Sequence, residues 1–248
     1  MNPSIDRLRD YAEANLPGLI FITISGAHLY GFESPDSDVD LRGTFAAPVR
    51  DILSLRPPKE TIETKYIVDG VEVEMVGHEI AKYLRLLVKP NGYVLEQICS
   101  PLVVRTSDTH QQLIALAKAG LSRGLYRHYH GFATGELKAY HRGPAKTVKQ
   151  LLYLHRVLMT GVVLMQSGEV EMNLHRLADR LGYDVSALVA LKRLEKAEFE
   201  GDDEPVLARI DELFGLLDKA RDESALPEEV PNRAEIDDFL VSLRLSGV

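Results

Sequence analysis

Asp38 and Asp40 are the residues whose type and spacing point most directly to chemistry. They stand two apart in Ser37-Asp38-Val39-Asp40-Leu41, which has the alternating polar and apolar pattern of a β-strand. Side chains two apart on a strand project from one face, so these carboxylates would repel each other without a cation. Oxygen ligands suit Mg²⁺ or Mn²⁺, and two such ions can support phosphoryl transfer.

A third carboxylate is expected from a neighbouring strand. Glu72 and Glu74 alternate with apolar residues between Val71 and Met75, so they share one face of a second strand. If that face joins the face of Asp38 and Asp40, either glutamate completes a set of three carboxylates. It would bind metal and receive a proton from an attacking hydroxyl.

A glycine turn upstream of the two aspartates could hold phosphate. Ser25-Gly26-Ala27 directly follows a short apolar run that is typical of a buried strand. Gly26 lets the backbone approach an anion closely, and successive N–H groups in such a turn can bind phosphate. Tyr30, four residues on, either lines a nucleotide pocket or packs in the core.

The aspartates have two other interpretations. They could be turn and capping residues, with Arg42 as a salt-bridge partner. A calcium loop running from Asp36 is excluded, because its sixth and twelfth positions are Leu41 and Ala47 rather than glycine and glutamate.

The elements that must position these residues form an α+β fold: a small mixed β-sheet with flanking helices, then an all-helical C-terminal part. The Asp69-Gly70 pair is a strong signal for a hairpin turn. We expect a catalytic domain over 1–110 and a helical domain over 111–248 that completes the nucleotide and acceptor cleft. Strands are predicted for 19–24, 38–43, 61–68 and 71–76, and helices for 5–15, 80–87, 110–119, 145–166, 174–181, 185–196, 205–221 and 233–243. Residues 28–32 are expected to form a short helical turn, 95–99 a buried helix face, and 48–60 a polar connection.

Composition and charge narrow the class of protein. A net charge of −8 argues against nonspecific coating of nucleic acid. The only cysteine, Cys99, excludes an intramolecular disulfide and fits a reducing cytoplasm. No signal peptide is evident, and the apolar run from Val157 to Met165 is too short to cross a membrane.

Residues 121–156 carry seven Lys or Arg but only one acid. This local positive field is suited to a polyphosphate or a confined stretch of RNA.

Within that basic window, Lys149, Tyr153 and Arg156 are spaced i, i+4 and i+7 on a predicted helix. They therefore share one face. Such a face could bind phosphates, or it could be an ordinary solvated helix surface.

The chain resembles the polymerase-β nucleotidyltransferase superfamily, and within it the RNA-repair-associated (RlaP-like) branch. The superfamily signature is matched by Gly26-Ala27-His28-Leu29-Tyr30-Gly31 and by Ser37-Asp38-Val39-Asp40-Leu41-Arg42-Gly43. The branch is matched by residues 74–84, 91–96 and 149–161.

The resemblance implies a role for each matching residue. Asp38, Asp40 and Glu74 would carry out catalysis and bind metal, and the resemblance favours Glu74 over Glu72 for the third position. The implied cofactor is Mg²⁺ or Mn²⁺, with two ions bound. Two positions depart from the family pattern, since Ala27 replaces a serine and Glu74 replaces an aspartate. The expected substrate-binding residues are Ser25, Gly26, Ala27, Tyr30, Ser37, Lys149, Tyr153 and Arg156.

The predicted function is transfer of a nucleoside monophosphate from a nucleoside triphosphate to an acceptor hydroxyl, with an RNA end as the acceptor and release of pyrophosphate. The alternative is a non-catalytic nucleotide- or RNA-binding module of the same fold, which Ala27 and Glu74 favour. A third hypothesis keeps the nucleotidyl transfer but has a protein or a small molecule as the acceptor. We expect a cytoplasmic protein without a membrane partner, and the sequence leaves the nucleotide base and oligomeric state open.

Overall fold

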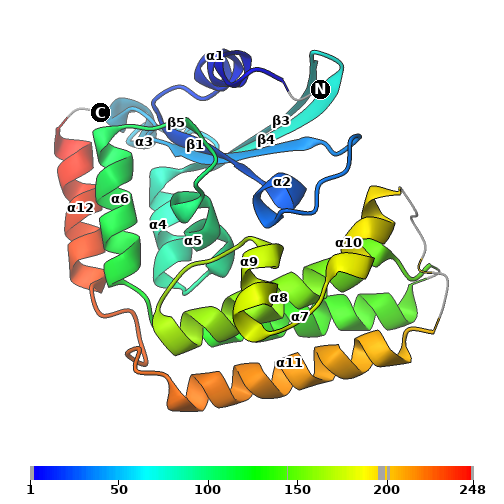
Figure 1. Cartoon of the computed structure of the whole chain (residues 1–248). Helices are drawn as coiled ribbons and strands as arrows, with labels where there is room; N and C mark the ends of the chain where they lie inside the picture. Colours follow the sequence, from blue (N-terminus) through cyan, green and yellow to red (C-terminus); the bar gives the residue numbers. More distant parts are fainter. Residues whose placement is uncertain (1–2, 144, 195–198, 200–201, 247–248) are drawn as a thin grey trace. The chain divides into compact units, whose positions relative to one another are not determined.

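The structure is a computed structural model that describes every residue except 1–2, 144, 195–198, 200–201 and 247–248. The chain forms two compact units (Figure 1). Unit 1 comprises Met1–Leu29, Asp38–Gly120 and Val230–Val248, and unit 2 comprises Tyr30–Ser37 and Leu121–Glu229. Both units therefore draw on separate stretches of sequence.

Unit 1 is built on a five-stranded mixed sheet with the strand order β3-β4-β2-β1-β5. The β2–β4 pair is parallel, whereas the pairs β1–β2, β1–β5 and β3–β4 are antiparallel. The strands are β1 (Leu19–Ser25), β2 (Val39–Phe45), β3 (Thr61–Val68), β4 (Val71–Glu79) and β5 (Val103–Arg105), and the helices are α1 (Ile5–Asn15), α2 (Gly26–Tyr30), α3 (Val49–Ile52), α4 (Ile80–Val88), α5 (Gly92–Cys99), α6 (Asp108–Ala119) and α12 (Arg233–Leu245).

Helices cover both faces of this sheet. Leu8 and Ala12 of α1, and Leu16 directly after it, join a core cluster with alternate residues of β2 and β4, such as Leu41 and Met75. Alternation then turns the intervening residues of those strands to the opposite face, where α4, α5 and α6 contact the sheet. The polar positions of β2 and β4 therefore lie on the face opposite α1.

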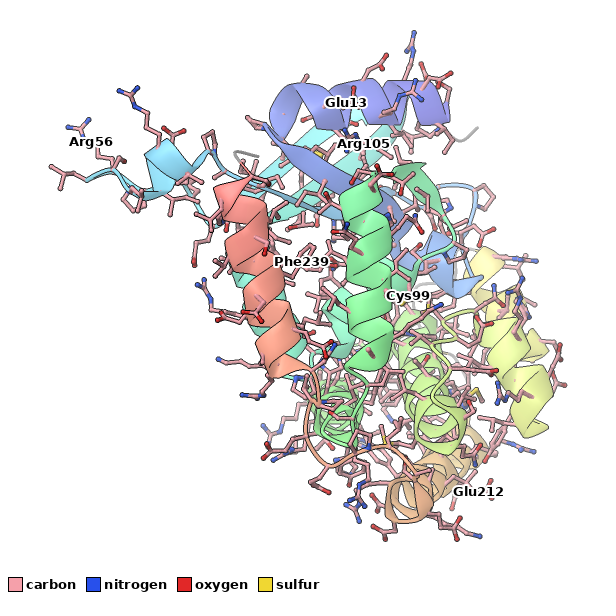
Figure 2. The ribbon with its side chains drawn as sticks, turned by 90° about the vertical axis from the view of Figure 1, so that its left-hand side faces the viewer. Glu13, Arg56, Cys99, Arg105, Glu212 and Phe239 are labelled. Carbon is pink, nitrogen blue, oxygen red and sulfur yellow. The ribbon has the colours of Figure 1, made fainter. Side chains whose placement is uncertain are left out.

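The end of the chain completes unit 1. Helix α12 packs on α4, and Arg244 donates to Glu79 and to the carbonyl of Ala47. Glu79 also caps α4 by accepting from the Ala81 N–H. At the β5 edge of the sheet, Arg105 pairs with Glu13 of α1 at 3.2 Å. Both residues are labelled in Figure 2.

Unit 2 is helical and is centred on α8. Gly161 of α8 allows close packing, because a Cβ there would lie 2.9 Å from the Cβ of Tyr129 and 3.0 Å from Leu217. Helices on either side of this position therefore approach the α8 backbone closely. The helices are α7 (Leu125–Arg142), α8 (Val148–Ser167), α9 (Leu174–Leu181), α10 (Ser186–Arg193) and α11 (Glu204–Glu223).

Helix α8 is long and apolar enough to cross a membrane by length and composition, contrary to the expectation from its uninterrupted apolar run. The charged residues Lys149 and Arg156 of this helix lie before that run. Within unit 2, 83% of its apolar window is buried, which is typical of the core helix of a globular protein.

The sequence predicted most elements with small shifts at their ends. The Asp69-Gly70 hairpin is confirmed, with φ of 52° and 83° at the two turn residues. Glu195 and Lys196 of the predicted helix 185–196 lie outside the described residues. Three elements were missed: α3, placed in the connection 48–60, β5 and the long helix α7. Gly131, Gly135 and many aromatic residues lower the helix propensity of α7, and its packing on α8 stabilises it instead.

The two units differ in extent from the predicted domains 1–110 and 111–248. Residues 111–120 and α12 belong to unit 1, and residues 30–37 belong to unit 2. Sequence order alone places α12 with the other late helices, whereas its ion pair with Glu79 holds it to unit 1.

Candidate functional site

Four polar residues lie side by side across one face of the unit 1 sheet. Ser25 pairs with Asp40, Asp40 with Glu74, and Glu74 with Lys65. Directly paired residues project from the same face, so the parallel register of β2 and β4 brings the predicted carboxylates of Asp40 and Glu74 together. Ser25 is buried, with 3% of its surface exposed.

The glycine turn lies against the carboxylate of Asp40. Gly26 begins α2 with a φ of +63°, a conformation that favours glycine. A Cβ at this position would lie 2.0 Å from Asp40 Oδ2. Glycine is therefore required both by the backbone and by the approach of Asp40, and Ala27 follows in the half-buried first turn of α2.

Arg42 lies between the two carboxylates. Its Nη2 is 2.8 Å from Asp40 Oδ1 and 2.7 Å from Glu74 Oε1. Its Nε donates to the Tyr93 hydroxyl at 2.6 Å, and its Nη1 donates to the carbonyl of Glu74. The predicted salt bridge between Arg42 and Asp40 is confirmed, and the same guanidinium also reaches Glu74.

These cations keep Glu74 ionised. Burial raises the pKa of Glu74, but hydrogen bonds and charge from Lys65 and Arg42 together outweigh burial, and the pKa falls below its usual value. The Lys65 Nζ lies 3.1 Å from Glu74 Oε2. Glu74 is thus a carboxylate at neutral pH, as a metal ligand must be.

The third expected ligand, Asp38, precedes β2 and is exposed. It lies outside the paired strand, so the spacing rule that put it on the face of Asp40 does not apply. Within the described part of the chain, no group of three or more His, Cys, Asp or Glu is arranged to hold a metal. The oxygen donors suit Mg²⁺, which binds oxygen at about 2.0–2.1 Å, but an ion shared by Asp40 and Glu74 would have to displace the Arg42 Nη2.

A second group of predicted residues lies in unit 2. The Arg156 guanidinium is 3.9 Å from the centre of the Tyr30 ring, and Tyr153 contacts Tyr30 edge to face at 5.7 Å. Lys149 Nζ lies 5.9 Å from the Tyr153 ring. The shared helix face is thus present, but Arg156 is only 3% exposed and packs among aromatic rings rather than in solvent.

Ser37 also belongs to unit 2. Its hydroxyl accepts from the Ser34 N–H at 2.9 Å and lies 3.1 Å from the Ser34 hydroxyl. Lys192 Nζ donates to that same Ser34 hydroxyl at 2.6 Å. The position of Ser37 is therefore set by this short hydroxyl network.

The structure brings together Ser25, Gly26, Asp40 and Glu74 in unit 1. It separately brings together the Tyr30, Lys149, Tyr153 and Arg156 side chains in unit 2. The sequence reasoning missed Lys65, Tyr93 and the contact of Arg42 with Glu74. Arg42 could have been placed from its i+2 spacing to Asp40, but Lys65 and Tyr93 come from other elements and carry no local signal.

Comparisons with known proteins identify the family and the relatives of this chain. The family described as "RNA repair pathway DNA polymerase beta family" (RlaP) matches residues 2–242. The uncharacterized protein MJ0002 of Methanocaldococcus jannaschii is 30% identical over 224 residues, which cover 88% of this chain and 90% of that protein. The uncharacterized protein YcgL of Bacillus subtilis is 25% identical over 217 residues, 86% of this chain and 82% of that protein.

Among solved structures, a nucleotidyltransferase-like protein from Exiguobacterium sibiricum aligns with 97% of this chain and 77% of its own, at 11% identity and a TM-score of 0.34. The match to the family, by contrast, spans nearly the whole chain and includes both the Gly26 turn and the Asp38–Asp40 segment. This chain belongs to the RNA repair pathway DNA polymerase beta family.

Proposed function

We propose that this protein transfers a nucleoside monophosphate from a nucleoside triphosphate to a hydroxyl at an RNA end, in the cytoplasm. The acceptor oxygen forms a bond to the α-phosphorus, and the bond from that phosphorus to pyrophosphate breaks. The observation that carries the proposal is the row of Asp40 and Glu74 on paired strands, with the Gly26 turn against Asp40.

Asp38, Asp40 and Glu74 would hold Mg²⁺ or Mn²⁺, two ions in all. Bound there, the ions would neutralise the triphosphate and lower the pKa of the acceptor hydroxyl. Arg42 would have to leave the space between the carboxylates, while remaining available to the Tyr93 hydroxyl. Glu74, ionised at neutral pH, would accept the proton of the acceptor hydroxyl.

The remaining predicted residues would bind the nucleotide. Backbone N–H groups of Gly26 and Ala27 would contact the phosphates, with the Ser25 hydroxyl beside them. The cluster of Arg156 and Tyr30 offers a cation held rigidly by an aromatic ring. A rigid cation suits charge stabilisation, since it needs no reorganisation during the reaction.

The test is incubation with each α-labelled triphosphate, Mg²⁺ or Mn²⁺, and RNA, followed by analysis of pyrophosphate and labelled product. Asp40→Asn and Glu74→Gln should lower the rate by about a hundredfold or more. Glu72→Gln is the matched control, because Glu72 lies on the same strand and also pairs with Lys65, at 3.5 Å. Equal rates in the Glu72 and Glu74 variants would remove the proposed role of Glu74.

A second candidate is a non-catalytic nucleotide- or RNA-binding module. The contacts of Arg42 and Lys65 favour it, because protein cations already balance the carboxylates of Asp40 and Glu74. This candidate predicts triphosphate binding without pyrophosphate release under every metal tested. Labelled transfer to a protein or small-molecule acceptor, but not to RNA, would keep the chemistry and change the substrate.

A further inference from the structure

A cavity of about 350 Å³ in unit 2 is lined by three arginines and belongs to none of the sites described above. It is formed at the start of α7 and the end of α11, together with the chain that follows α11. These two helices pack against each other (Figure 1). The lining residues are Arg123, Tyr126, Arg127, Arg221, Asp222 and Glu228.

The Arg221 guanidinium and the backbone of Arg123 are held in place. The Arg221 guanidinium lies 4.5 Å from the centre of the Tyr126 ring. Tyr126 is itself fixed, because its hydroxyl donates to Asp218 Oδ1 at 2.6 Å. The backbone N–H of Arg123 donates to the carbonyl of Pro227 at 2.7 Å. The cavity is therefore preorganised by contacts that a ligand need not supply.

Donors in this cavity remain available for a ligand. The Nε of Arg123 is buried and has no hydrogen-bond acceptor among the described residues. Arg127 is exposed, and its side chain makes no ion pair with any residue that the structure describes. A buried donor without an acceptor is costly, so an anion that accepts from Arg123 would remove that cost.

The acidic residues of the cavity are weak competitors. Glu228 pairs with Arg123 at 2.9 Å and Asp222 pairs with Arg221 at 2.7 Å, but these acidic side chains are 69% and 66% exposed. Ion pairs at such exposure contribute little to stability. Three arginines against two acids leave a net positive charge, and planar guanidinium groups match the oxygens of phosphate.

We propose that this cavity binds a phosphate group of an RNA strand. The choice of RNA as the strand rests on the proposed function, whereas the phosphate site rests on the arginines alone. A phosphate would accept hydrogen bonds from Arg123 and Arg127 while Arg221 stays on the Tyr126 ring.

The test is the affinity of a short fluorescent single-stranded RNA for the whole protein, measured by anisotropy without nucleotide or divalent metal. Arg127→Gln should weaken binding about tenfold and lower the salt dependence, log Kd against log salt, by about 0.7. Arg142→Gln is the matched control. It removes the same charge from an exposed residue of the same helix, about 22 Å away along its axis, and it should change the affinity less than twofold.

Glu228→Gln gives a test in the opposite direction. Removing the competing carboxylate should tighten RNA binding threefold or more, an effect that a purely structural role would not produce. Inorganic phosphate and pyrophosphate should compete with RNA for the unaltered protein, and this competition should be lost in Arg127→Gln. An RNA with a 5′-phosphate compared with one bearing a 5′-hydroxyl separates a terminal phosphate from a backbone phosphate as the bound group.

Equal weakening by Arg127→Gln and Arg142→Gln would overturn the proposal, as would no measurable binding of RNA to the unaltered protein. Stronger competition by an acidic peptide than by RNA of equal charge would also overturn it. The Asp40 and Glu74 variants test the catalytic proposal alone, because they are expected to lose pyrophosphate release while their affinity for RNA stays unchanged. The two proposals therefore fail by different measurements.

Discussion

Replacing Gly26 by alanine tests whether the glycine turn and Asp40 form one site. The added Cβ would lie 2.0 Å from Asp40 Oδ2 and 3.0 Å from its Cγ, so the carboxylate must move. Asp40 has little freedom to do so without loss, because its other oxygen accepts from Arg42 Nη2 at 2.8 Å. The substitution therefore disturbs the carboxylate that the proposed reaction needs.

The expected cost has two parts. A non-glycine residue at a φ of +63° costs about 1 kcal/mol. Displacing the Asp40 carboxylate from Arg42 costs about 1–3 kcal/mol more, the value of a charge-assisted hydrogen bond. Gly70→Ala isolates the first part, because Gly70 has a φ of +83° and nothing lies within 4 Å of its added Cβ. We expect about 2–4 kcal/mol for Gly26→Ala and about 1 kcal/mol for Gly70→Ala.

Hydrogen exchange of the β1 and β2 amides is the assay, because it reports on unit 1 alone. A double-mutant cycle with Asp40→Ala separates the two parts, since alanine keeps only the Cβ, which would lie 3.3 Å from the added atom. In that background Gly26→Ala should cost only the backbone part. An equal cost with and without the Asp40 carboxylate would refute the reasoning.

Two further substitutions test unit 1. Burial, with the charges of Lys82 and Arg42, lowers the pKa of His78 to about 4. The usual pKa of histidine is 6.5, so between pH 6.5 and 4 the unfolded chain binds more protons than the folded chain. The free energy of unfolding therefore decreases by roughly 2 kcal/mol as the pH falls from 6.5 to 4. His78→Gln should flatten this dependence in urea titrations, and an unchanged slope would contradict it. Arg244→Ala should cost about 3 kcal/mol by removing the cation from the 7% exposed Glu79 side chain, which keeps only its hydrogen bonds from backbone N–H groups. Adding Glu79→Gln should recover part of the loss in the same assay.

Local patterns predicted the individual elements of unit 1 well. The run 19–24 became β1, and the Asp69-Gly70 pair became a hairpin turn because both residues take positive φ. These features depend on residues within a few positions of each other. The α+β class followed from their order along the chain.

Pairing across the sheet could not be predicted in the same way. The parallel register that sets Asp40 opposite Glu74 joins strands separated by a hairpin arm, and period-two alternation gives the face but not the partner. The family resemblance favoured Glu74 over Glu72 as the third carboxylate, and the register shows that Glu74 is the residue opposite Asp40. The resemblance gave no indication of Lys65, which reaches Glu74 from β3.

The composition of unit 1 from three stretches of chain has a consequence for folding during synthesis. Its sheet is complete at β5, but α12 emerges only after all of residues 121–229. Synthesis proceeds at about 5–20 residues per second. The surface of α4 that packs on α12, which includes Leu84 and Val88, therefore stays exposed for roughly 5–20 s before α12 is made. Newly made chains therefore carry an open apolar surface on α4, which is covered only when α12 docks.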